Sequence, residues 1–361
     1  MTILEKVNLL GTAGSYDSCG PRACEVKVAR GLGGIYSARA EHKSCRLFKT
    51  LLDNDCSFDC KYCPNAQGCG RRRASYQPAE LARLFDLLHT HLKVDGLFLS
   101  SSVAGDPDDV TERMLESVRL LRGKYAFHGY VHFKVLPGTS YELIKQASEL
   151  ATRLSINIEA PNKRVLAELA PCKDFKNDLV RRQRWISKLN LAGGQTTQLI
   201  INDLATDKEI LQMVDWEYRA MNLRRVYYSA FKPVKGTPLE HATPGSGLRQ
   251  HRLYNVDFLL RVYGYQLKEV EAVLEDGMLP REDPKLALAR ATFDAPVDIN
   301  EASYEELIRI PGIGPRTARK LITRQGKITR YEQLQELGGR VKRAKPFIEL
   351  NGKRQTGLGE F

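Results

Sequence analysis

The sequence lacks any long apolar run. Nothing in its 361 residues approaches the roughly 18 consecutive apolar residues that indicate a membrane-spanning helix. Its first residues, MTILEKVNLL, interrupt a short apolar stretch with charge, so we expect no signal peptide and no membrane partner. Together with 42% hydrophobic and 27% charged residues, these absences predict a folded cytoplasmic protein. The chain is long enough for one large domain and a small one.

Internal repeats and low-complexity tracts are also absent, and acidic residues are fewer than basic ones. The 55 Lys and Arg outnumber the 43 Asp and Glu, which gives a formal net charge of +12. Residues 309–345 alone hold eleven basic residues against two acidic ones, Glu332 and Glu336. A basic excess concentrated in one segment indicates a polyanionic partner.

Short apolar, β-branched runs alternate with amphipathic stretches between residues 45 and 265. This alternation predicts βαβ units and a parallel sheet, and six such units suit an α/β fold built as a partial (β/α)6 TIM-like barrel. The strands are expected at residues 46–52, 96–101, 130–136, 153–159, 196–202 and 225–231. The helices are expected at residues 78–93, 109–121, 140–151, 164–170 and 208–221.

Polar side chains recur with a period of two on some of these expected strands. Ser155, Asn157 and Glu159 alternate with isoleucines, and Lys134 follows the same alternation within residues 130–136. Both faces of a strand in a parallel barrel are buried, so polar side chains near its C-terminal end predict a functional site. The alternative interpretation is a polar residue inside the barrel that is satisfied by a neighbour.

Cysteine is sparse outside the first 70 residues. Of eight cysteines only Cys172 lies apart, and there we expect a small core residue. Thiols are kept reduced in the cytoplasm, so clustered cysteines indicate metal binding or catalysis rather than disulfides. Three of the clustered residues form the stretch CSFDCKYC with C-x3-C-x2-C spacing: Cys56, Cys60 and Cys63.

This set lacks the fourth ligand that structural zinc sites and most electron-carrying iron-sulfur clusters have. A cluster held by three cysteines leaves one iron open to a substrate or cofactor. The alternative is a zinc site completed by Cys69. Because no CxxC pair or HxxxH follows at the distance that zinc ribbons or fingers require, the cluster is favoured.

The CxxxCxxC motif, preceded by an expected strand and with Tyr62 just before its last cysteine, resembles the signature of the radical SAM superfamily. The resemblance implies that Cys56, Cys60 and Cys63 ligate a [4Fe-4S] cluster whose fourth iron binds S-adenosylmethionine (SAM). It further implies reductive cleavage of SAM to methionine and a 5′-deoxyadenosyl radical, with an electron donor such as flavodoxin or ferredoxin.

The same resemblance implies further contacts with SAM. Tyr62 is expected beside the adenine, and Ser100-Ser101-Ser102 stands where the family often has a Gly-Gly-Glu-like run. The other side chains expected to contact SAM or the substrate are Lys134, Asn157 and Glu159.

Two features near the motif allow more than one interpretation. Four further cysteines suffice for an auxiliary iron-sulfur or zinc site, although single buried cysteines would explain them equally: Cys19, Cys24, Cys45 and Cys69. Arg71, Arg72 and Arg73 follow the motif directly, where they either receive a phosphate or form a solvated run of charge.

The segment 297–338 contains the sequence PGIG between two expected helices. Asn300 is expected to cap the first helix, which runs through Ile310, and Pro315 to begin the second. Gly312 and Gly314 permit a hairpin whose backbone N–H groups suit phosphate oxygens.

This segment resembles a helix-hairpin-helix DNA-binding unit of the competence-protein type. The resemblance implies contacts with the DNA phosphate backbone without base readout. The residues expected to make them are Gly312, Ile313, Gly314, Arg316, Thr317, Arg319 and Lys320. A helical module for protein contacts is the alternative.

Proline and charge gather at residues 280–296, where we expect a domain boundary. We predict a Cys-containing extension (1–44), a radical SAM partial barrel (45–290) and an all-α helix-hairpin-helix domain (291–361). Nearly the whole chain resembles prokaryotic radical SAM proteins with such a tail, which are regarded as DNA modification or repair enzymes. We therefore expect a radical SAM enzyme that acts on DNA. The alternatives are an RNA or tRNA modification enzyme and a non-catalytic iron-sulfur DNA-binding protein.

Overall fold

The computed structural model describes residues 1–14, 33–40 and 43–350, which fall into two compact units. The first unit comprises Met1–Ala205 and Gln212–Gln250, and the second comprises Thr206–Leu211 and His251–Phe361. Each unit is described by itself below. In the part of the chain that the structure describes, no helix is both long enough and apolar enough to cross a membrane.

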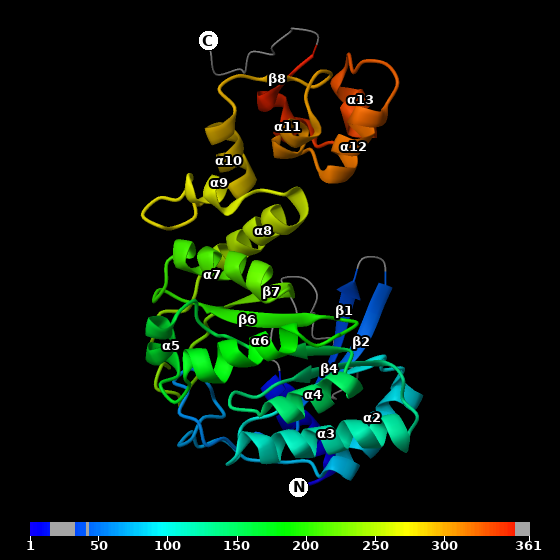
Figure 1. Ribbon diagram of the computed structural model, residues 1–361, viewed down its shortest axis with the longest axis vertical. Helices are drawn as coiled ribbons and strands as arrows, with labels where there is room; N and C mark the ends of the chain where they lie inside the picture. The colour runs from blue at the N-terminus through cyan, green and yellow to red at the C-terminus, as the bar shows by residue number, and fades with distance from the viewer. Residues whose placement is uncertain (15–32, 41–42, 351–361) are drawn as a thin grey trace. The chain divides into compact units, whose positions relative to one another are not determined.

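A seven-stranded sheet forms the centre of the first unit, with its strands side by side in chain order (Figure 1). The first two strands pair antiparallel, and every later pair of neighbours is parallel. The six parallel strands confirm the expected partial barrel, whereas the antiparallel edge strand was not expected. The strands are β1 (Ile35–Ala40), β2 (Lys43–Leu51), β3 (Gly96–Ser100), β4 (Tyr130–Lys134), β5 (Arg153–Ser155), β6 (Gln195–Ile201) and β7 (Leu223–Ala230).

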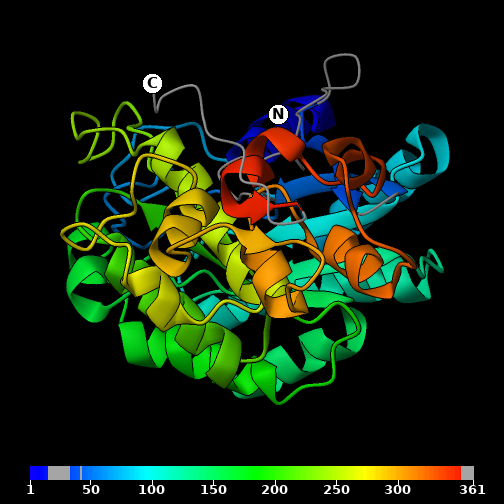
Figure 2. The ribbon, with the colours of Figure 1, turned by 90° about the horizontal axis from the view of Figure 1, so that it is seen from above.

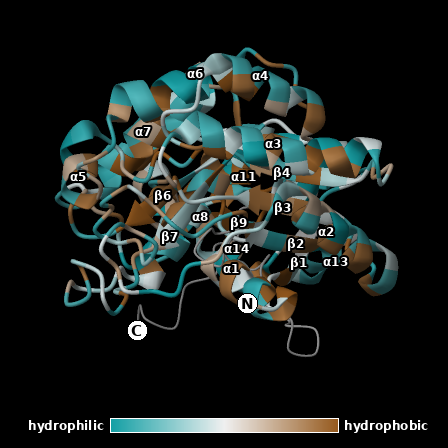
Figure 3. Ribbon diagram, turned by 90° about the horizontal axis from the view of Figure 1, so that it is seen from below, coloured by the Kyte–Doolittle hydropathy of each residue, from teal (hydrophilic) through white to brown (hydrophobic). Residues whose placement is uncertain are grey.

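Amphipathic helices follow the strands, and Figure 3 shows both hydrophilic and hydrophobic segments on α2, α3 and α4. Local signals set where they begin. In α2, Pro78 occupies the first turn and Gln77 forms a capping box with Glu80. The helical elements are α1 (Ile3–Ala13), α2 (Pro78–Leu92), α3 (Pro107–Gly123), α4 (Tyr141–Leu150), α5 (Lys163–Leu169), the π-helix η2 (Phe175–Val180), α6 (Arg181–Ser187) and α7 (Asp207–Ala220).

Strand β5 is shorter than the sequence pattern predicted. It ends at Ser155, and the chain meets the sheet again only at Glu159, which forms an isolated bridge with Leu199. Glu159 has a φ of 60°, in the left-handed region that a residue with a side chain rarely adopts. The pattern was misread because the isoleucines after Ser155 are buried without forming ladder hydrogen bonds.

The second unit is a cluster of short helices closed by one pair of two-residue strands; Figure 2 shows these helices from above, in yellow to red. Strands β8 (Val297–Asp298) and β9 (Ile348–Glu349) pair in parallel. The helical elements are α8 (Gly247–Tyr263, which begins in the first unit), α9 (Leu267–Glu271), α10 (Pro284–Thr292), α11 (Tyr304–Arg309), α12 (Pro315–Thr323), α13 (Tyr331–Glu336), α14 (Val341–Ala344) and the 3-10 turn η3 (Lys345–Phe347).

The expected cap of the first hairpin helix was wrong. Ser303, rather than Asn300, caps α11 through a capping box with Glu306. The Asn300 side chain instead accepts from the Ile328 N–H at 2.6 Å and donates to the Ile328 carbonyl at 3.0 Å. Ile328 is itself buried in the apolar core of this unit. Asn300 therefore fastens the segment after α12 to the segment before α11.

Candidate functional site

The three cysteines of CSFDCKYC lie on an irregular loop between β2 and α2, residues 53–77, called the cysteine loop below. A tight turn shapes its centre, because the Cys63 N–H donates to the Cys60 carbonyl at 3.0 Å. The Ser57 N–H donates to the Val103 carbonyl at 2.7 Å and so attaches the loop to the segment that follows β3. The loop is therefore held at the C-terminal end of the sheet.

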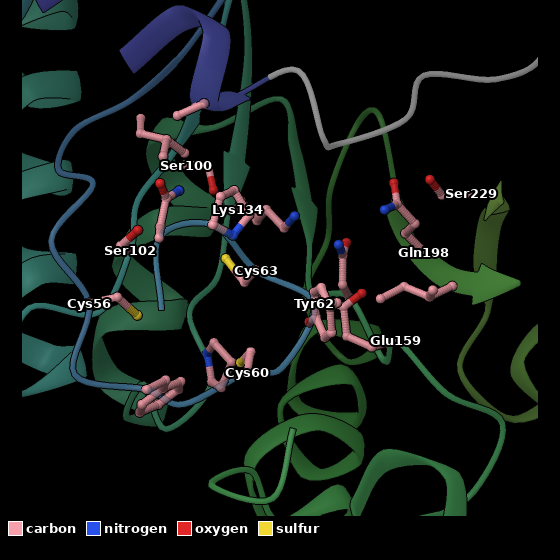
Figure 4. Close-up of a pocket in the computed structure, with 18 of the residues that line it drawn as sticks. Cys56, Cys60, Tyr62, Cys63, Ser100, Ser102, Lys134, Glu159, Gln198 and Ser229 are labelled. Atoms are coloured by element: carbon pink, nitrogen blue, oxygen red, sulfur yellow. The ribbon is translucent and has the colours of Figure 1, made fainter. Parts of the chain in front are cut away.

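A cavity of about 600 Å³ opens beside the cysteine loop, and Cys56, Cys60 and Cys63 all line it (Figure 4). Every side chain expected to bind SAM lines the same cavity: Tyr62, Ser100, Ser101, Lys134, Asn157 and Glu159. The C-terminal ends of parallel strands form the functional face of barrels of this kind. The structure thus brings together nine residues that the sequence named, although their contacts with a cofactor stay predictions.

Lys173, which the sequence analysis missed, lies among the polar side chains of this cavity. Its Nζ lies 3.8 Å from Oε1 of Glu159 and donates to the Tyr62 hydroxyl at 3.3 Å. Burial alone would lower the pKa of Lys173, but the neighbouring Cys60 and Glu159 outweigh burial and raise it above the ordinary value. No local sequence signal marks this lysine, because the contact joins residues 111 positions apart.

The three thiols differ in acidity. A hydrogen bond with the Cys172 thiol has the largest effect on Cys60 and, helped by Lys173, lowers the pKa of Cys60 to about 6. Burial raises the pKa of Cys63 to about 12, and it raises the pKa of Cys56 as well. Cys60 is therefore the thiol that most readily supplies a thiolate. Cys172 was expected in the core, but it is exposed, because it follows α5 at the surface beside Cys60.

The donor set suits an iron-sulfur cluster better than a single ion. Within residues 1–14, 33–40 and 43–350, no three or more Cys, His, Asp or Glu side chains are grouped so that they could hold a metal ion. A cubane cluster makes a different demand, because each of its cysteines binds a separate iron. Three thiols around one cavity, with the cationic Lys173 among them to offset thiolate charge, meet that demand.

The Cys69 thiol is hydrogen-bonded to the backbone. Its Sγ donates to the Gly236 carbonyl at 3.2 Å and the Cys63 carbonyl at 3.7 Å, and it does not line the cavity. An auxiliary site that also uses Cys45 stays a prediction. Cys45 lies on β2, where burial raises its thiol pKa. The other two cysteines of that expected set, Cys19 and Cys24, lie outside the described residues.

In the second unit, the PGIG sequence forms the expected hairpin between α11 and α12. Gly312 has a φ of 87°, and a Cβ at this position would lie 2.5 Å from the Arg340 carbonyl oxygen. The hairpin carbonyls face inward: the Gly312 oxygen accepts from the Arg340 N–H at 2.9 Å, and the Ile313 oxygen accepts from Lys285 Nζ at 2.6 Å. Glycine is therefore required at position 312 by both conformation and space.

The expected DNA contacts divide into two groups. Arg316, Arg319 and Lys320 are exposed on the first turns of α12, directly after the hairpin. The side chains of Ile313 and Thr317 are buried, which leaves only their backbone for contact with DNA, and the contacts of both groups stay predictions. The physical reason for the burial is that the apolar core of this unit extends beneath the hairpin.

Two family models match the chain. Residues 52–216 match the radical SAM superfamily, and residues 294–345 match a helix-hairpin-helix motif. Radical SAM domains use a [4Fe-4S] cluster and SAM. No curated protein matches this sequence.

Solved structures that resemble part of this chain share little sequence with it. They include HydG, a maturase of the [FeFe]-hydrogenase (12% identity, TM-score 0.48, covering 58% of this chain and 48% of that one). Methylornithine synthase PylB is similar at 16% identity and a TM-score of 0.46, covering 58% and 60%. The radical SAM methyltransferase TsrM from Kitasatospora setae has 14% identity and a TM-score of 0.40, covering 53% and 37%.

The chain spans only about half the length of these solved proteins. Family assignment therefore rests on the two sequence matches and on the cysteine motif that one of them contains. Residues 52–216 thus form a radical SAM domain, and residues 294–345 add a helix-hairpin-helix motif.

Proposed function

We propose that this protein is a radical SAM enzyme that modifies or repairs DNA. The observation that carries the proposal is the convergence of Cys56, Cys60 and Cys63 on one cavity in a chain that also has a basic helix-hairpin-helix motif. We further propose that the protein is located in the reducing cytoplasm, because the six cysteines that the structure describes are free thiols.

When bound, a [4Fe-4S] cluster and SAM supply a 5′-deoxyadenosyl radical that removes a hydrogen atom from the substrate. The chain itself holds the cofactors, orients the substrate and excludes water from the site. Cys56, Cys60 and Cys63 would hold the cluster. Lys173 fixes the Tyr62 hydroxyl and the Glu159 carboxylate in the cavity wall, so that both present a defined surface to the cofactor.

The charge of the cavity supports an anionic occupant. Among its described lining residues are four lysines, Lys49, Lys134, Lys173 and Lys232, and a single carboxylate, Glu159. Such an excess of positive charge attracts phosphate-bearing molecules. Figure 4 shows Gln198 and Ser229 on the other side of the cavity from the cysteines, so the lining continues beyond the expected cluster position.

The second unit would bind the DNA. Exposed Arg316, Arg319 and Lys320 follow the hairpin, and contacts of this kind bind phosphates without reading sequence. A base inside a duplex must leave the stack to reach a cavity, so flipped or single-stranded DNA is the proposed substrate form. An electron donor such as flavodoxin or ferredoxin is part of the same proposal.

The test is anaerobic incubation of the reconstituted full chain with SAM, a reductant and uniformly deuterated DNA. We expect deuterium to appear in 5′-deoxyadenosine, and Cys60→Ala, which lacks one cluster ligand, to abolish the product. Parallel reactions with deuterated tRNA test the RNA alternative. Binding of DNA without any 5′-deoxyadenosine would instead support a non-catalytic iron-sulfur protein and contradict the proposal.

Binding is tested separately by titrating DNA at several salt concentrations. Each phosphate neutralised contributes a slope of about −0.9 to the dependence of log K on log salt concentration. We expect Arg319→Ala and Lys320→Ala each to make the slope shallower by about one such contact. A salt-independent affinity would contradict a phosphate-backbone contact.

A further inference from the structure

Arg73 is the last of three consecutive arginines, and its side chain turns into the cysteine loop. Its Nη1 donates to the carbonyls of Asn54 at 2.5 Å and Asn65 at 2.9 Å. Its Nη2 donates to the carbonyls of Ala66 at 3.0 Å and Cys69 at 3.1 Å. One guanidinium therefore joins four backbone positions of the same loop.

These positions flank the cysteine motif on both sides. Asn54 lies two residues before Cys56, and Asn65 lies two residues after Cys63. Between the bridge residues Asp53 and Ser75 the loop contains no helix and no strand. Its backbone hydrogen bonds are short turns and single contacts, of which one crosses the motif, from the Gln67 N–H to the Phe58 carbonyl at 2.7 Å. The Arg73 side chain adds four hydrogen bonds that join the residue before the motif to residues after it, where no helix or strand pair does so.

The Asn54 side chain holds the backbone on both sides of Arg73. Its Oδ1 accepts from the Ala74 N–H at 2.7 Å, and its Nδ2 donates to the Arg72 carbonyl at 3.0 Å. The two residues thus hold each other, because Arg73 binds the carbonyl of Asn54 while Asn54 fixes the neighbours of Arg73.

A phosphate-binding role for Arg73 does not fit these contacts. Both of its terminal nitrogens already donate to carbonyls, and its Nε lies 3.7 Å from Oδ1 of Asp55. Arg72 differs, because its side chain is 62% exposed. The interpretation of the three arginines as one solvated run is therefore wrong for Arg73.

We propose that Arg73 is a positioning residue, which holds the two flanks of the cysteine motif at the separation that a three-cysteine [4Fe-4S] cluster requires. This inference rests on the proposed function, since it assumes the cluster. The positioning role requires the branched, planar guanidinium of an arginine. A guanidinium has five N–H donors in one plane, whereas a lysine ammonium has three donors on one atom.

The experiment compares Arg73→Met and Arg73→Lys with two controls. Arg72→Met removes an exposed neighbour. Arg122→Met removes another arginine that donates to backbone carbonyls, those of Leu150, Phe127 and Gly129, but does so away from the cysteine loop. Arg122→Met thus reports the general effect of losing such a side chain on stability.

Each variant is reconstituted anaerobically, and iron and sulfide are measured per folded chain. The decay of cluster absorbance in air and the electron paramagnetic resonance spectrum of the reduced cluster, with and without SAM, are then recorded. We expect the cluster lifetime to be about tenfold shorter in Arg73→Met and intermediate in Arg73→Lys, because loss of a side chain that orients metal ligands typically has an effect of this size. Arg72→Met and Arg122→Met should keep the wild-type lifetime, although Arg122→Met should lower the melting temperature.

Equal cluster content and lifetime in Arg73→Met and Arg72→Met would overturn the inference. So would a loss in Arg73→Met that Arg122→Met reproduces, because it would reflect general stability. If Arg73→Met does not fold, Arg73→Lys decides: a folded Arg73→Lys with the wild-type lifetime and spectrum also overturns it. Failure of the wild-type chain to bind any cluster would refute the proposed function instead.

Discussion

The Nζ of Lys173 lies 3.8 Å from Oε1 of Glu159, and the two side chains are only 8% and 10% exposed. They form a charge pair in the wall of the cavity, where neither charge is well solvated. A buried pair of this kind contributes little net stability compared with apolar residues, but the loss of one partner leaves the other charge unpaired.

We expect Lys173→Met to lower the free energy of unfolding of the cluster-free protein by about 3 kcal/mol, because it leaves the Glu159 carboxylate buried without its cation. The double variant Lys173→Met/Glu159→Gln should recover most of this loss. Urea denaturation of the four proteins of this double-mutant cycle measures the coupling. Additive losses would show that the two side chains do not depend on each other.

The contacts of Cys69 lead to a second prediction. Because its thiol donates to two backbone carbonyls and does not line the cavity, Cys69→Ala should retain the iron and sulfide content of the wild-type protein. Cys56→Ala is the matched comparison and should lose most of the iron. Metal analysis after anaerobic reconstitution tests both, and loss of the cluster in Cys69→Ala would revive a four-cysteine site.

The sequence was sufficient for features that depend on local patterns. Alternating strands and helices predicted the parallel barrel, and the polar residues with a period of two predicted which strand ends meet the cavity. PGIG predicted the hairpin because Gly312 must adopt a positive φ.

Features that depend on contacts between distant residues could not be predicted. Lys173 reaches Tyr62 across 111 positions, and the Asn300 side chain pairs with Ile328 instead of capping a helix. Arg73 appeared to belong to a run of surface charge, because the sequence does not show which way a loop side chain turns. In each case tertiary packing, rather than local propensity, decided the outcome.

The helix-hairpin-helix unit gives a matched pair of glycine variants. Gly312→Ala combines a strained φ of 87° with a contact of 2.5 Å to the Arg340 carbonyl, whereas Gly326→Ala has a similar φ of 79° but no atom within 4 Å. We expect Gly326→Ala to lower the free energy of unfolding by about 1 kcal/mol and Gly312→Ala to lower it by clearly more.

DNA affinity at fixed salt separates the two variants further. Gly312→Ala displaces the hairpin and should weaken binding by about tenfold, which corresponds to about 1.4 kcal/mol. Gly326→Ala leaves the hairpin in place and should bind like the wild-type chain. Equal affinities of the two variants would show that the hairpin at Gly312 is not the DNA contact.

Lys285 contacts the same hairpin and should make the stability of this unit depend on pH. Its Nζ donates to the Ile313 carbonyl and lies 4.4 Å from the centre of the Tyr263 ring. Burial lowers the pKa of Lys285 from 10.5 to about 7; Asp283 opposes this shift, while Arg343 supports it. A neutral amine still donates to the carbonyl, so the hairpin contact persists after deprotonation.

This shift fixes the sign of the pH dependence. Below pH 7 the ammonium is charged in both the folded and the unfolded states, and the cost of burying it is fully present. Between about pH 7 and 10.5 the unfolded state binds more protons, so the stability of this unit should rise with pH, by at most about 1.4 kcal/mol per unit. Lys285→Met lacks the titrating group. From pH 7 to 8.5, the stability of the wild-type chain relative to Lys285→Met should therefore increase by about 1.5 kcal/mol. Hydrogen exchange resolved to residues 284–350 measures the difference, and a constant or falling difference would show that Lys285 does not titrate in this range.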